Sequence, residues 1–433
     1  MTLVWFRLDL RLTDNPSLAA AVARGPVVPV FIWAPEEEGN WPPGAASRWW
    51  LHHSLRALDA SLRERGSRLL VRRGPSLEAL RALADETGAE AVFWNRRYEP
   101  ALRERDATVQ QGLLADGLRV ETFNSALLFE PWEIKNKNGE SYRVFTPFYN
   151  ACRAAAIGQP EDAPARWTAP RRWPRTVALD LAPTGNWTAG LRAAWQPGEA
   201  GAQQQLARFA RRAAVYRTQR DRPDMMGTSR LSPHLHFGEV SPRSVWQAIT
   251  EESFRRQLIW REFAHHLLWH HPRTAQEPLR PEFARIPWRH DPQGLRTWQR
   301  GQTGFALVDA GMRELWATGW MHNRARMVAG SFLVKDLLLP WQEGARWFWD
   351  TLVDADLANN TLGWQWIAGC GADAAPFFRI FNPQTQADRF DPRGEYARRW
   401  DAPAAVPPLD HDAARQRALA AFRAARESSR QPR

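Results

Sequence analysis

Short apolar segments alternate with helical patterns over the first 125 residues or so of the chain. Runs rich in Val, Leu, Phe and Trp predict β-strands at residues 3–6, 27–33, 68–74, 89–95 and 118–124. Between them, apolar residues recur at helical spacing, which predicts helices at residues 15–24, 47–66, 76–88 and 101–117. Such alternation favours a parallel, doubly wound sheet with helices on both faces. We therefore predict a Rossmann-like α/β domain at residues 1–126.

The periodicity is lost after this region. Residues 158–187 are rich in Pro, Arg and Ala, which is typical of a long connector, here placed at residues 127–199. No G-x-G-x-x-G motif follows the first predicted strand, so the sequence does not predict a dinucleotide site there. A small ligand could still bind at the carboxyl ends of the strands.

Helical periodicity dominates the rest of the chain. It predicts helices at residues 202–220, 241–250, 254–271, 307–319, 323–339 and 343–358. We therefore predict one large all-α domain at residues 200–433.

The charge balance indicates an anionic partner. The chain has 58 Lys and Arg residues against 47 Asp and Glu, a net charge of +11, and nucleic acid is the commonest partner for such a protein. Among its 24 tryptophans most should pack in cores, but some could stack on bases or on an aromatic cofactor, or pass electrons.

Other features bear on location and metals. Cys152 and Cys370 are too few for a disulfide framework, an iron–sulfur cluster or a four-cysteine zinc site, so reduced thiols and no metal are expected. The first residues include charges and no apolar core of a signal peptide, and no apolar run reaches about 18 residues. These features predict a cytoplasmic protein without a membrane span.

Three polar segments in the helical region could carry chemistry. Residues 228–239, "TSRLSPHLHFGE", place the hydroxyls of Thr228, Ser229 and Ser232 before a helix, with Arg220 and Arg230 nearby. Hydroxyls, free amides and arginines suit a phosphate, although an ordinary helix-capping loop has the same composition.

The other two segments have equally plain alternatives when taken singly. Residues 319–327, "GWMHNRARM", could form a solvated helix face, whereas residues 354–366, "DADLANNTLGWQW", combine two acids, two amides and two tryptophans. Acids can accept hydrogen bonds from a ribose, and an amide can face a heterocycle. Together the three segments predict a pocket for a large, anionic, aromatic cofactor.

The chain resembles the photolyase/cryptochrome family from residue 3 to about residue 425. The resemblance rests on the three segments above and on five further motifs: "LVWFRLDLRLTDN", "WNRRYEP", "LIWREF", "FLVKDLL" and "GADAAPFFRIFNP". The match is most like the bacterial cyclobutane pyrimidine dimer photolyases of the class I and class III type. The resemblance implies an antenna-type α/β domain, a connector, and a helical domain that binds FAD without a covalent link and also binds the DNA lesion.

The resemblance also implies residue roles. The implied FAD contacts are Tyr216, Thr228, Ser229, Leu231, Ser232, Asn323, Arg326, Asp354, Asp356 and Asn360, with Asn360 facing the flavin N5 atom. The implied electron-transfer chain, from inside to surface, is Trp364, Trp341 and Trp288. The implied DNA and lesion contacts are Arg220, Gln257, Trp260, Arg324, Met327, Trp366 and Arg379. In that set, Trp260 and Trp366 sandwich the flipped-out dimer.

Two positions depart from the commonest bacterial pattern. Gln257 stands where those enzymes have a glutamate that bonds the thymine carbonyls. Ala101 and Leu102 replace the Asn-Glu pair that holds an antenna folate. A second chromophore, either methenyltetrahydrofolate or a deazaflavin, would therefore be held differently, nearer Glu99 or the connector.

The expected activity is that of a deoxyribodipyrimidine photo-lyase, a carbon–carbon lyase acting on DNA that contains pyrimidine dimers. We expect a monomer without an obligatory protein partner. The alternative is a cryptochrome-type blue-light photoreceptor, which Asn360 and the short segment after "GEYARRW" disfavour. A dark redox flavoprotein is a third possibility, but no nicotinamide site is visible.

The sequence also predicts which lesion is repaired. Family members that repair (6-4) photoproducts carry two histidines four residues apart, and these positions are Asn323 and Met327 here. Neither side chain can transfer a proton near neutral pH. His322 is adjacent, but about 100° away around the helix, so a structural role is expected.

Overall fold

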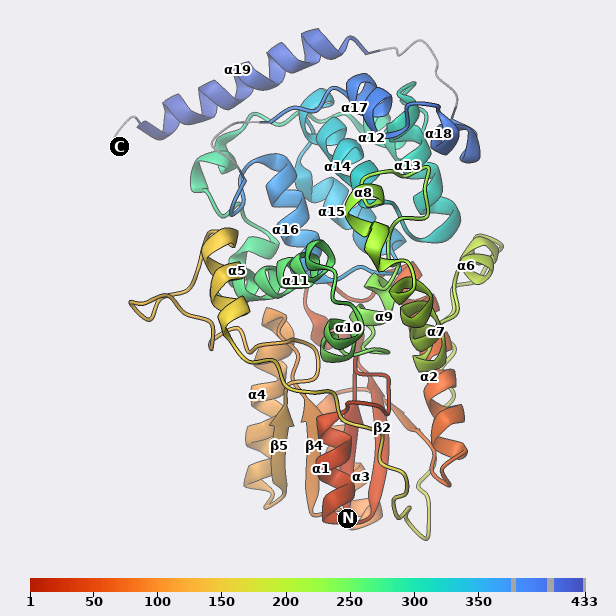
Figure 1. The fold of residues 1–433 in the computed structure, drawn as a ribbon. Helices are drawn as coiled ribbons and strands as arrows, with labels where there is room; N and C mark the ends of the chain where they lie inside the picture. Colours follow the sequence, from red (N-terminus) through yellow and green to blue (C-terminus); the bar gives the residue numbers. More distant parts are fainter. Residues whose placement is uncertain (375–378, 403–408, 431–433) are drawn as a thin grey trace.

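A computed structural model describes residues 1–374, 379–402 and 409–430 of the chain. Figure 1 shows a sheet flanked by helices at the N-terminal end, with a larger helical part stacked against it. The predicted α/β plus all-α fold is therefore confirmed.

The sheet has five parallel strands in the order β3-β2-β1-β4-β5. The strands are β1 (Thr2–Phe6), β2 (Val27–Trp33), β3 (Leu70–Arg73), β4 (Ala91–Asn95) and β5 (Arg119–Phe123). Thr2 of the central strand β1 lies opposite Val27 of β2 and Ala91 of β4. β1 and β4 are buried along their whole length, which explains why their sequences are continuous apolar runs rather than alternating ones.

Helices cover both faces of the sheet. They are α1 (Pro16–Arg24), α2 (Ala45–Arg63), α3 (Ser76–Thr87) and α4 (Pro100–Ala115), with the short 3-10 helix η1 (Pro35–Glu38). α1 and α2 pack on the face that carries Val4 and Phe6, whereas α3 and α4 pack on the face that carries Leu3 and Trp5. The doubly wound arrangement follows from this alternation of side chains along β1.

The connector contains two helices that the sequence did not predict, α5 (Phe145–Ala154) and α6 (Thr188–Ala194). Its extended part runs along the edge strand β3, where Val177 N donates to Val71 O over 3.1 Å and Val71 N donates to Thr176 Oγ1 over 2.9 Å. These bonds occupy backbone groups that an open sheet edge would expose.

The helical part is built from helices of very different lengths. They are α7 (Glu199–Ala210), α8 (Tyr216–Gln219), α9 (Ser232–His236), α10 (Pro242–Ala248), α11 (Glu252–His270), α12 (Pro292–Gln299), α13 (Ala306–Thr318), α14 (Asn323–Ser331), α15 (Trp341–Thr351), α16 (Leu357–Ala368), α17 (Pro383–Phe390), α18 (Glu395–Arg399) and α19 (His411–Arg430). Short 3-10 helices lie at η2 (Ala213–Val215), η3 (Pro272–Ala275) and η4 (Pro281–Arg285), and a π turn, η5 (Phe332–Asp336), follows α14.

The prediction of one continuous helix at 343–358 is wrong. α15 ends at Thr351, the backbone is extended at Leu352, and Val353 N donates to Gly319 O over 2.7 Å. Asp356 then caps the start of α16 through Asn359 N. The break leaves Asp354 and Asp356 on a loop between two helices, where several other segments meet. The predicted helices at 202–220 and 323–339 are likewise divided, into α7, η2 and α8, and into α14 and η5.

No helix in residues 1–374, 379–402 or 409–430 is long and apolar enough to cross a membrane.

Candidate functional site

Asp354, in the loop between α15 and α16, joins three separate segments. Its carboxylate accepts a hydrogen bond from Ser232 Oγ, at the start of α9, over 2.6 Å. The same carboxylate accepts two contacts from Arg326 Nη2 of α14, at 2.9 and 3.1 Å. Because the carboxylate is almost wholly buried and charged hydrogen bonds are strong, this group fixes the relative positions of three predicted flavin contacts.

Asp356 is held by a different set of partners. Besides capping α16, its carboxylate accepts from Asn359 Nδ2 over 2.6 Å and lies 3.4 Å from His265 Nε2 and 3.7 Å from His236 Nδ1. Burial alone would raise the pKa of Asp356, but the neighbouring His265 and His236 hold that pKa well below its usual range. Burial would likewise lower the pKa of His265, and the Asp356 charge raises it instead. The carboxylate is therefore ionised and fixed in place.

Two of the predicted flavin contacts are amide side chains. Asn323 lies at the start of α14, and Asn360 lies in the first turn of α16. Asn360 Nδ2 donates to Ala345 O of α15 over 3.1 Å, which sets the direction of its amide plane. Asn323 is exposed, and its Nδ2 lies 3.7 Å from Met327 Sδ, one helical turn away. Asn360 is thus positioned by the protein, whereas Asn323 remains open to a ligand.

The segment 228–232 forms a bent loop before α9. Ser229 Oγ accepts from Leu231 N over 3.3 Å, and Ser229 O accepts from Gln205 Nε2 of α7 over 2.6 Å. Leu231 is buried, whereas Thr228 and Ser229 are half-buried. Tyr216, at the start of α8, is buried with its ring edge-on to Phe254. Gln205 thus holds the backbone of this loop, and the hydroxyl of Ser229, which only accepts from Leu231 N, can still donate to a phosphate. The hydroxyl of Ser232 donates to Asp354 instead.

The donor and acceptor set fits a flavin dinucleotide. Hydroxyls of the 228–232 loop suit a pyrophosphate, the guanidinium of Arg326 suits a reduced, anionic ring, and two fixed carboxylates can accept from hydroxyl or ring N–H groups. The helix break at 352–356 places Asp354 and Asp356 on one short loop, where each carboxylate gathers its own set of partners.

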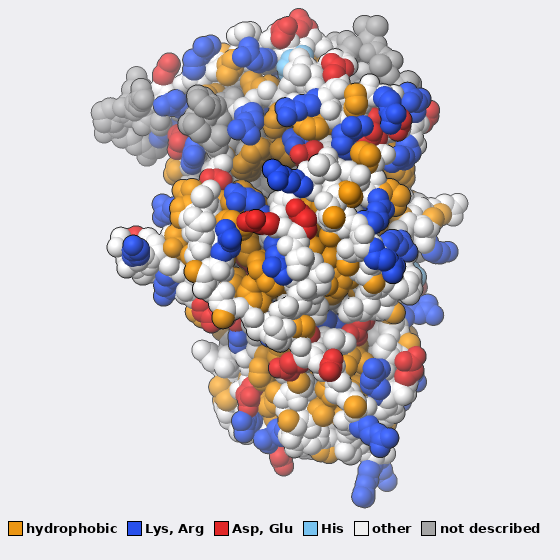
Figure 2. Space-filling view, viewed as in Figure 1, with side chains coloured by type: hydrophobic (Ala, Val, Ile, Leu, Met, Phe, Trp, Pro, Cys, Tyr) orange, Lys and Arg blue, Asp and Glu red, His pale blue; other side chains and the backbone are white. Residues whose placement is uncertain are grey.

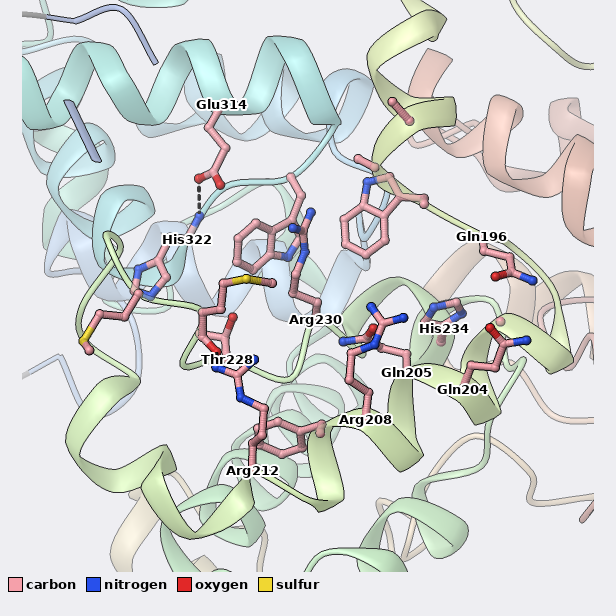
Figure 3. Close-up of a pocket in the computed structure, with 18 of the residues that line it drawn as sticks. Gln196, Gln204, Gln205, Arg208, Arg212, Thr228, Arg230, His234, Glu314 and His322 are labelled. Atoms are coloured by element: carbon pink, nitrogen blue, oxygen red, sulfur yellow. Dashed lines mark hydrogen bonds between the residues drawn. The ribbon is translucent and has the colours of Figure 1, made fainter. Parts of the chain in front are cut away.

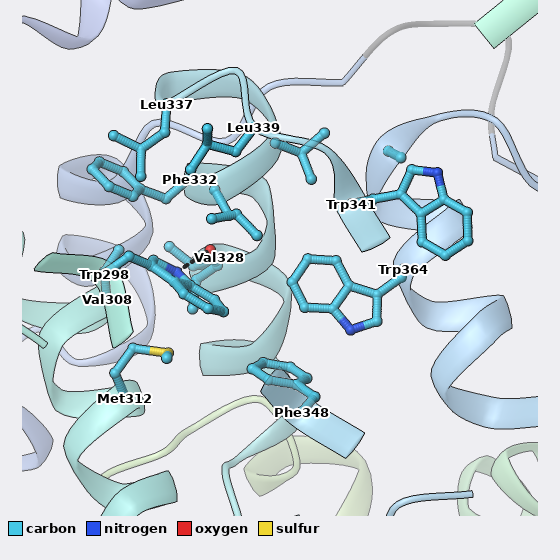
Figure 4. Packing of buried hydrophobic residues seen from close by; sticks show 14 of the residues in the cluster. Trp298, Val308, Met312, Val328, Phe332, Leu337, Leu339, Trp341, Phe348 and Trp364 are labelled. Carbon is cyan, nitrogen blue, oxygen red and sulfur yellow. Dashed lines mark hydrogen bonds between the residues drawn. The ribbon is translucent and has the colours of Figure 1, made fainter. Parts of the chain in front are cut away.

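The three predicted electron-transfer tryptophans belong to one core, and Trp288 is the least buried of them. Trp364 of α16 and Trp341 of α15 are each 2% exposed, whereas Trp288 is only partly buried against the same core. Figure 4 shows the indoles of Trp364 and Trp341 within this buried cluster. The burial agrees with Trp288 as the surface end of a path; the electron-transfer role stays a prediction.

Trp298, a further tryptophan of this core, was not predicted from the sequence to have a role. Trp298 of α12 is fully buried, donates from Nε1 to Ala329 O over 2.9 Å, and meets Trp364 edge-on at a centroid distance of 6.3 Å. Nothing in its local sequence separates it from an ordinary core residue.

Trp260 of α11 has one face covered. Phe145 of the connector helix α5 stacks on it, with centroids 3.6 Å apart and planes inclined by 7°. A base can therefore stack only on the opposite face of the Trp260 indole. Trp366 is half-buried, and the guanidinium of Arg379 lies 5.3 Å from its ring centroid. The central part of the "GADAAPFFRIFNP" motif, residues 375–378, lies outside the described residues.

Gln257 and the predicted phosphate-binding arginines are already linked to one another. Arg220 Nη2 donates to Gln257 Oε1 over 3.1 Å, and Gln257 Nε2 donates to Ser253 O over 3.3 Å. Asp221 pairs with Arg324 at 2.8 Å and lies 4.0 Å from Arg220. One carboxylate therefore partly neutralises two arginines that DNA phosphates would otherwise meet.

The surface of the helical part carries basic and apolar side chains side by side. Figure 2 shows Lys and Arg side chains spread widely over this face, with apolar side chains between them. Such a surface suits a nucleic acid, because cations meet the backbone and apolar groups meet unstacked bases.

Near the predicted second chromophore site, Glu99 is paired with Arg97 at 2.6 Å at the start of α4. Burial would raise the pKa of Glu99, but the charge of Arg97 holds it down to about 2. Burial raises the pKa of the neighbouring Glu38 to about 7. Ala101 and Leu102 provide no polar side chain there, so their neighbours supply whatever polar contacts exist.

No group of three or more His, Cys, Asp or Glu residues in the part of the chain that the structure describes could hold a metal ion.

Comparison with known proteins identifies the family. Residues 2–167 match the family model for DNA photolyase, and residues 254–411 match that for the FAD-binding domain of DNA photolyase. The deoxyribodipyrimidine photo-lyase of Agrobacterium fabrum is 44% identical over 99% of this chain and 98% of its own length. The chain therefore belongs to the DNA photolyase family, and its cofactor is FAD.

Two further comparisons place it within that family. A bacterial class III photolyase from Agrobacterium tumefaciens superposes with a TM-score of 0.94, at 43% identity and over 98% of both chains. Cryptochrome-1 of Arabidopsis thaliana is 42% identical over 92% of this chain and 62% of its own length. The resemblance to bacterial photolyases is therefore confirmed.

Proposed function

We propose that this protein is a deoxyribodipyrimidine photo-lyase that uses light to split cyclobutane pyrimidine dimers in DNA. The observation that carries the proposal is the assembly around Asp354, which links Ser232 of α9 with Arg326 of α14. A relative named for this activity shares 44% identity over nearly the whole chain, which supports it.

When bound, FAD supplies the absorption of light and the transfer of one electron to the dimer and back. The chain's own residues bind and orient the cofactor and the dimer, and they exclude water from the site. Arg326 provides positive charge on α14, Asn360 presents an amide held by Ala345, and Trp260 offers one free face for stacking. No residue needs to act as a general acid or base.

We propose that Trp364, Trp341 and Trp288 carry electrons that restore the reduced cofactor. The partial exposure of Trp288, beside two tryptophans that are each 2% exposed, supports Trp288 as the surface end. We further propose residues 1–126, 127–199 and 200–433 as the antenna-type, connecting and catalytic units of a cytoplasmic monomer, with any second chromophore near Glu99.

The proposal is tested by illuminating the purified protein with an oligonucleotide that contains a single thymine dimer. We expect the dimer to disappear in near-UV or blue light and to persist in the dark. A matched oligonucleotide with a (6-4) photoproduct should remain unchanged, because Asn323 and Met327 cannot transfer a proton. Turnover of both lesions at similar rates would contradict the assignment, and turnover of neither would favour the photoreceptor alternative.

A further inference from the structure

A cavity of about 320 Å³ opens on the other side of the 228–232 loop. It lies among α6, α7, α13, α18 and the loop before α14, and Figure 3 shows its lining side chains. Of the predicted flavin contacts only Thr228 lines it, and none of the predicted DNA contacts does. The cavity is therefore distinct from the site assigned to the repair reaction.

Positive charge in this cavity is only partly balanced by the protein, because the charges of Glu314 and Asp354 act on Arg230 alone among the lining arginines. Its lining includes four arginines: Arg208, Arg212, Arg230 and Arg399. Within residues 1–374, 379–402 and 409–430, none of these four pairs with a carboxylate; Arg212 and Arg399 donate only to the backbone oxygens of Met226 and Asp224, at 2.7 and 2.9 Å.

The one acid in the lining is already occupied. Glu314 Oε2 accepts from Tyr396 OH over 2.7 Å and from His322 N over 2.9 Å. Burial raises the pKa of Glu314 above its usual value, whereas the bonds from Tyr396 and His322 act against that rise. Four arginines face this single acid in the lining, so the cavity carries net positive charge.

Arg230 presents donors that the protein does not use. Its guanidinium lies between two indoles, 4.3 Å from the Trp195 centroid and 4.9 Å from that of Trp320. Its Nε and Nη2 atoms are buried without a hydrogen-bond partner in the described part of the chain. The backbone of Arg230 also has φ of +52°, a conformation that a non-glycine residue rarely adopts. A residue with a strained backbone and unpaired donors in the wall of a cavity marks a candidate binding site.

His322 lines the cavity without adding charge to it. Burial lowers the pKa of His322 to about 4, so its ring is neutral near pH 7. Its Nδ1 accepts from Arg324 N over 3.2 Å, so the proton resides on Nε2, and the backbone of Arg220 supplies an acceptor for the ring. The positive charge of the cavity therefore comes from its arginines.

We propose that this cavity binds a small organic phosphate, of about the size of a nucleoside monophosphate. Guanidinium N–H groups match phosphate oxygens, and the excess of arginines over acids in the lining suits an anion. Gln196 and Gln204 offer amides to the polar remainder of the ligand, and Trp195 and Trp320 offer apolar surface. A cavity of this volume is at the lower end of the range for small-molecule sites. This binding function is independent of dimer repair.

The ligand would touch the loop that holds predicted flavin contacts. Thr228 lines the cavity, and Gln205, also in its lining, donates to Ser229 O over 2.6 Å. Occupancy should therefore stabilise the loop from behind and slow the release of FAD.

The test is a calorimetric titration of the FAD-loaded protein in the dark with adenosine 5′-monophosphate, ribose 5-phosphate, inorganic phosphate and adenosine. We expect saturable binding of the two phosphate esters with Kd below about 1 mM, weaker binding of inorganic phosphate, and none of adenosine. Arg208→Glu should weaken ester binding by about tenfold or more.

Arg211→Glu is the matched control, because Arg211 is exposed at the end of the same helix but does not line the cavity. It should leave ester binding unchanged, and both variants should keep dimer repair. Equal losses in the two variants, no saturable binding of either ester, or competition between ester and dimer-containing DNA would each overturn the proposal. Repair is measured separately, so failure of this site and failure of the repair function are distinguishable.

Discussion

At the scale of single residues, Gly344 decides where Trp364 can lie. A Cβ atom at Gly344 would stand 2.0 Å from the Trp364 ring, so the indole packs directly on the backbone of α15. Phe348 meets the same indole edge-on at 5.0 Å. The ring is therefore held rigidly at the inner end of the proposed chain.

Replacing Trp364 with Phe should separate two functions. We expect light-driven reduction of oxidised flavin to slow by about tenfold or more, with repair retained once the flavin is chemically reduced. The smaller ring should also cost about 1–3 kcal/mol of stability. Flavin absorbance under blue light and dimer loss measure the two rates.

Trp298→Phe is the control, because Trp298 lies in the same core and touches Trp364. It should lose similar stability and keep photoreduction. Wild-type photoreduction in Trp364→Phe would show that this indole serves only packing.

The pair of His265 and Asp356 predicts a pH-dependent stability. Because the folded-state pKa of His265 is raised, its stabilising contribution is fully present below about pH 6.5 and is lost as the pH rises through that pKa. The lowered pKa of Asp356 acts in the opposite direction, so its contribution is present above about pH 3.9 and is lost on acidification. The pair should therefore stabilise the fold most in mildly acidic solution.

We expect His265→Asn to reduce the free energy of unfolding by about 2–4 kcal/mol at pH 5 and by clearly less at pH 8. Denaturant unfolding at both pH values measures this. His290→Asn, at an exposed position, should change little at either pH. A difference for His265→Asn that does not depend on pH would contradict the ion pair.

At the scale of elements, α5 gives the connector a role beyond joining two parts. It packs against α11, where Phe145 covers one face of Trp260 and Arg256 lies 4.8 Å from the Phe145 centroid. The stack of cation, phenyl and indole fixes the plane on which a flipped base would lie.

Phe145→Leu should weaken binding of dimer-containing DNA by about fivefold and leave undamaged DNA unaffected, because only the stacking plane is loosened. Electrophoretic mobility shifts with both DNAs measure the ratio. Phe148→Leu is the control, since Phe148 lies on the same helix but packs on Phe263 and His266. If both variants lose lesion affinity equally, the effect is on the fold and not on Trp260.

At the scale of the whole molecule, the excess of positive charge attracts DNA, and the arginines predicted to contact its phosphates are partly neutralised by a neighbouring carboxylate. Asp221 is shared by Arg324 and Arg220, and DNA phosphates must compete with it. The net charge of +11 still attracts DNA from a distance, and salt screens this attraction.

DNA affinity should therefore fall steeply with salt. Arg324→Ala should lower the affinity and reduce the slope of log K against log salt by about one, whereas Asp221→Asn should raise the affinity. Fluorescence anisotropy over a range of salt concentrations measures both. Arg24→Ala, on α1 in the α/β part, is the charge-matched control and should leave the slope unchanged. Equal slopes for Arg324→Ala and the wild type would exclude a phosphate contact.

Much of this molecule was determined by the sequence alone. Short apolar runs predicted all five strands, and the runs of β1, β2 and β4 are continuous because a parallel sheet buries both faces of its inner strands. The polar segments at 228–239, 319–327 and 354–366 predicted a cofactor pocket, because acids and hydroxyls beside tryptophans do not suit a plain core. The family resemblance assigned their individual roles.

The tertiary structure alone decided how distant segments meet. Helical periodicity continues through Leu352 and Val353, but in the structure the backbone is extended at Leu352 and Val353 N bonds to Gly319 O, so the helix stops there. Packing across the fold likewise brings Phe145 against Trp260. It also places Arg230 between the indoles of Trp195 and Trp320. Periodicity records that a side chain is buried, but not which remote residue covers it, because that depends on how whole elements dock.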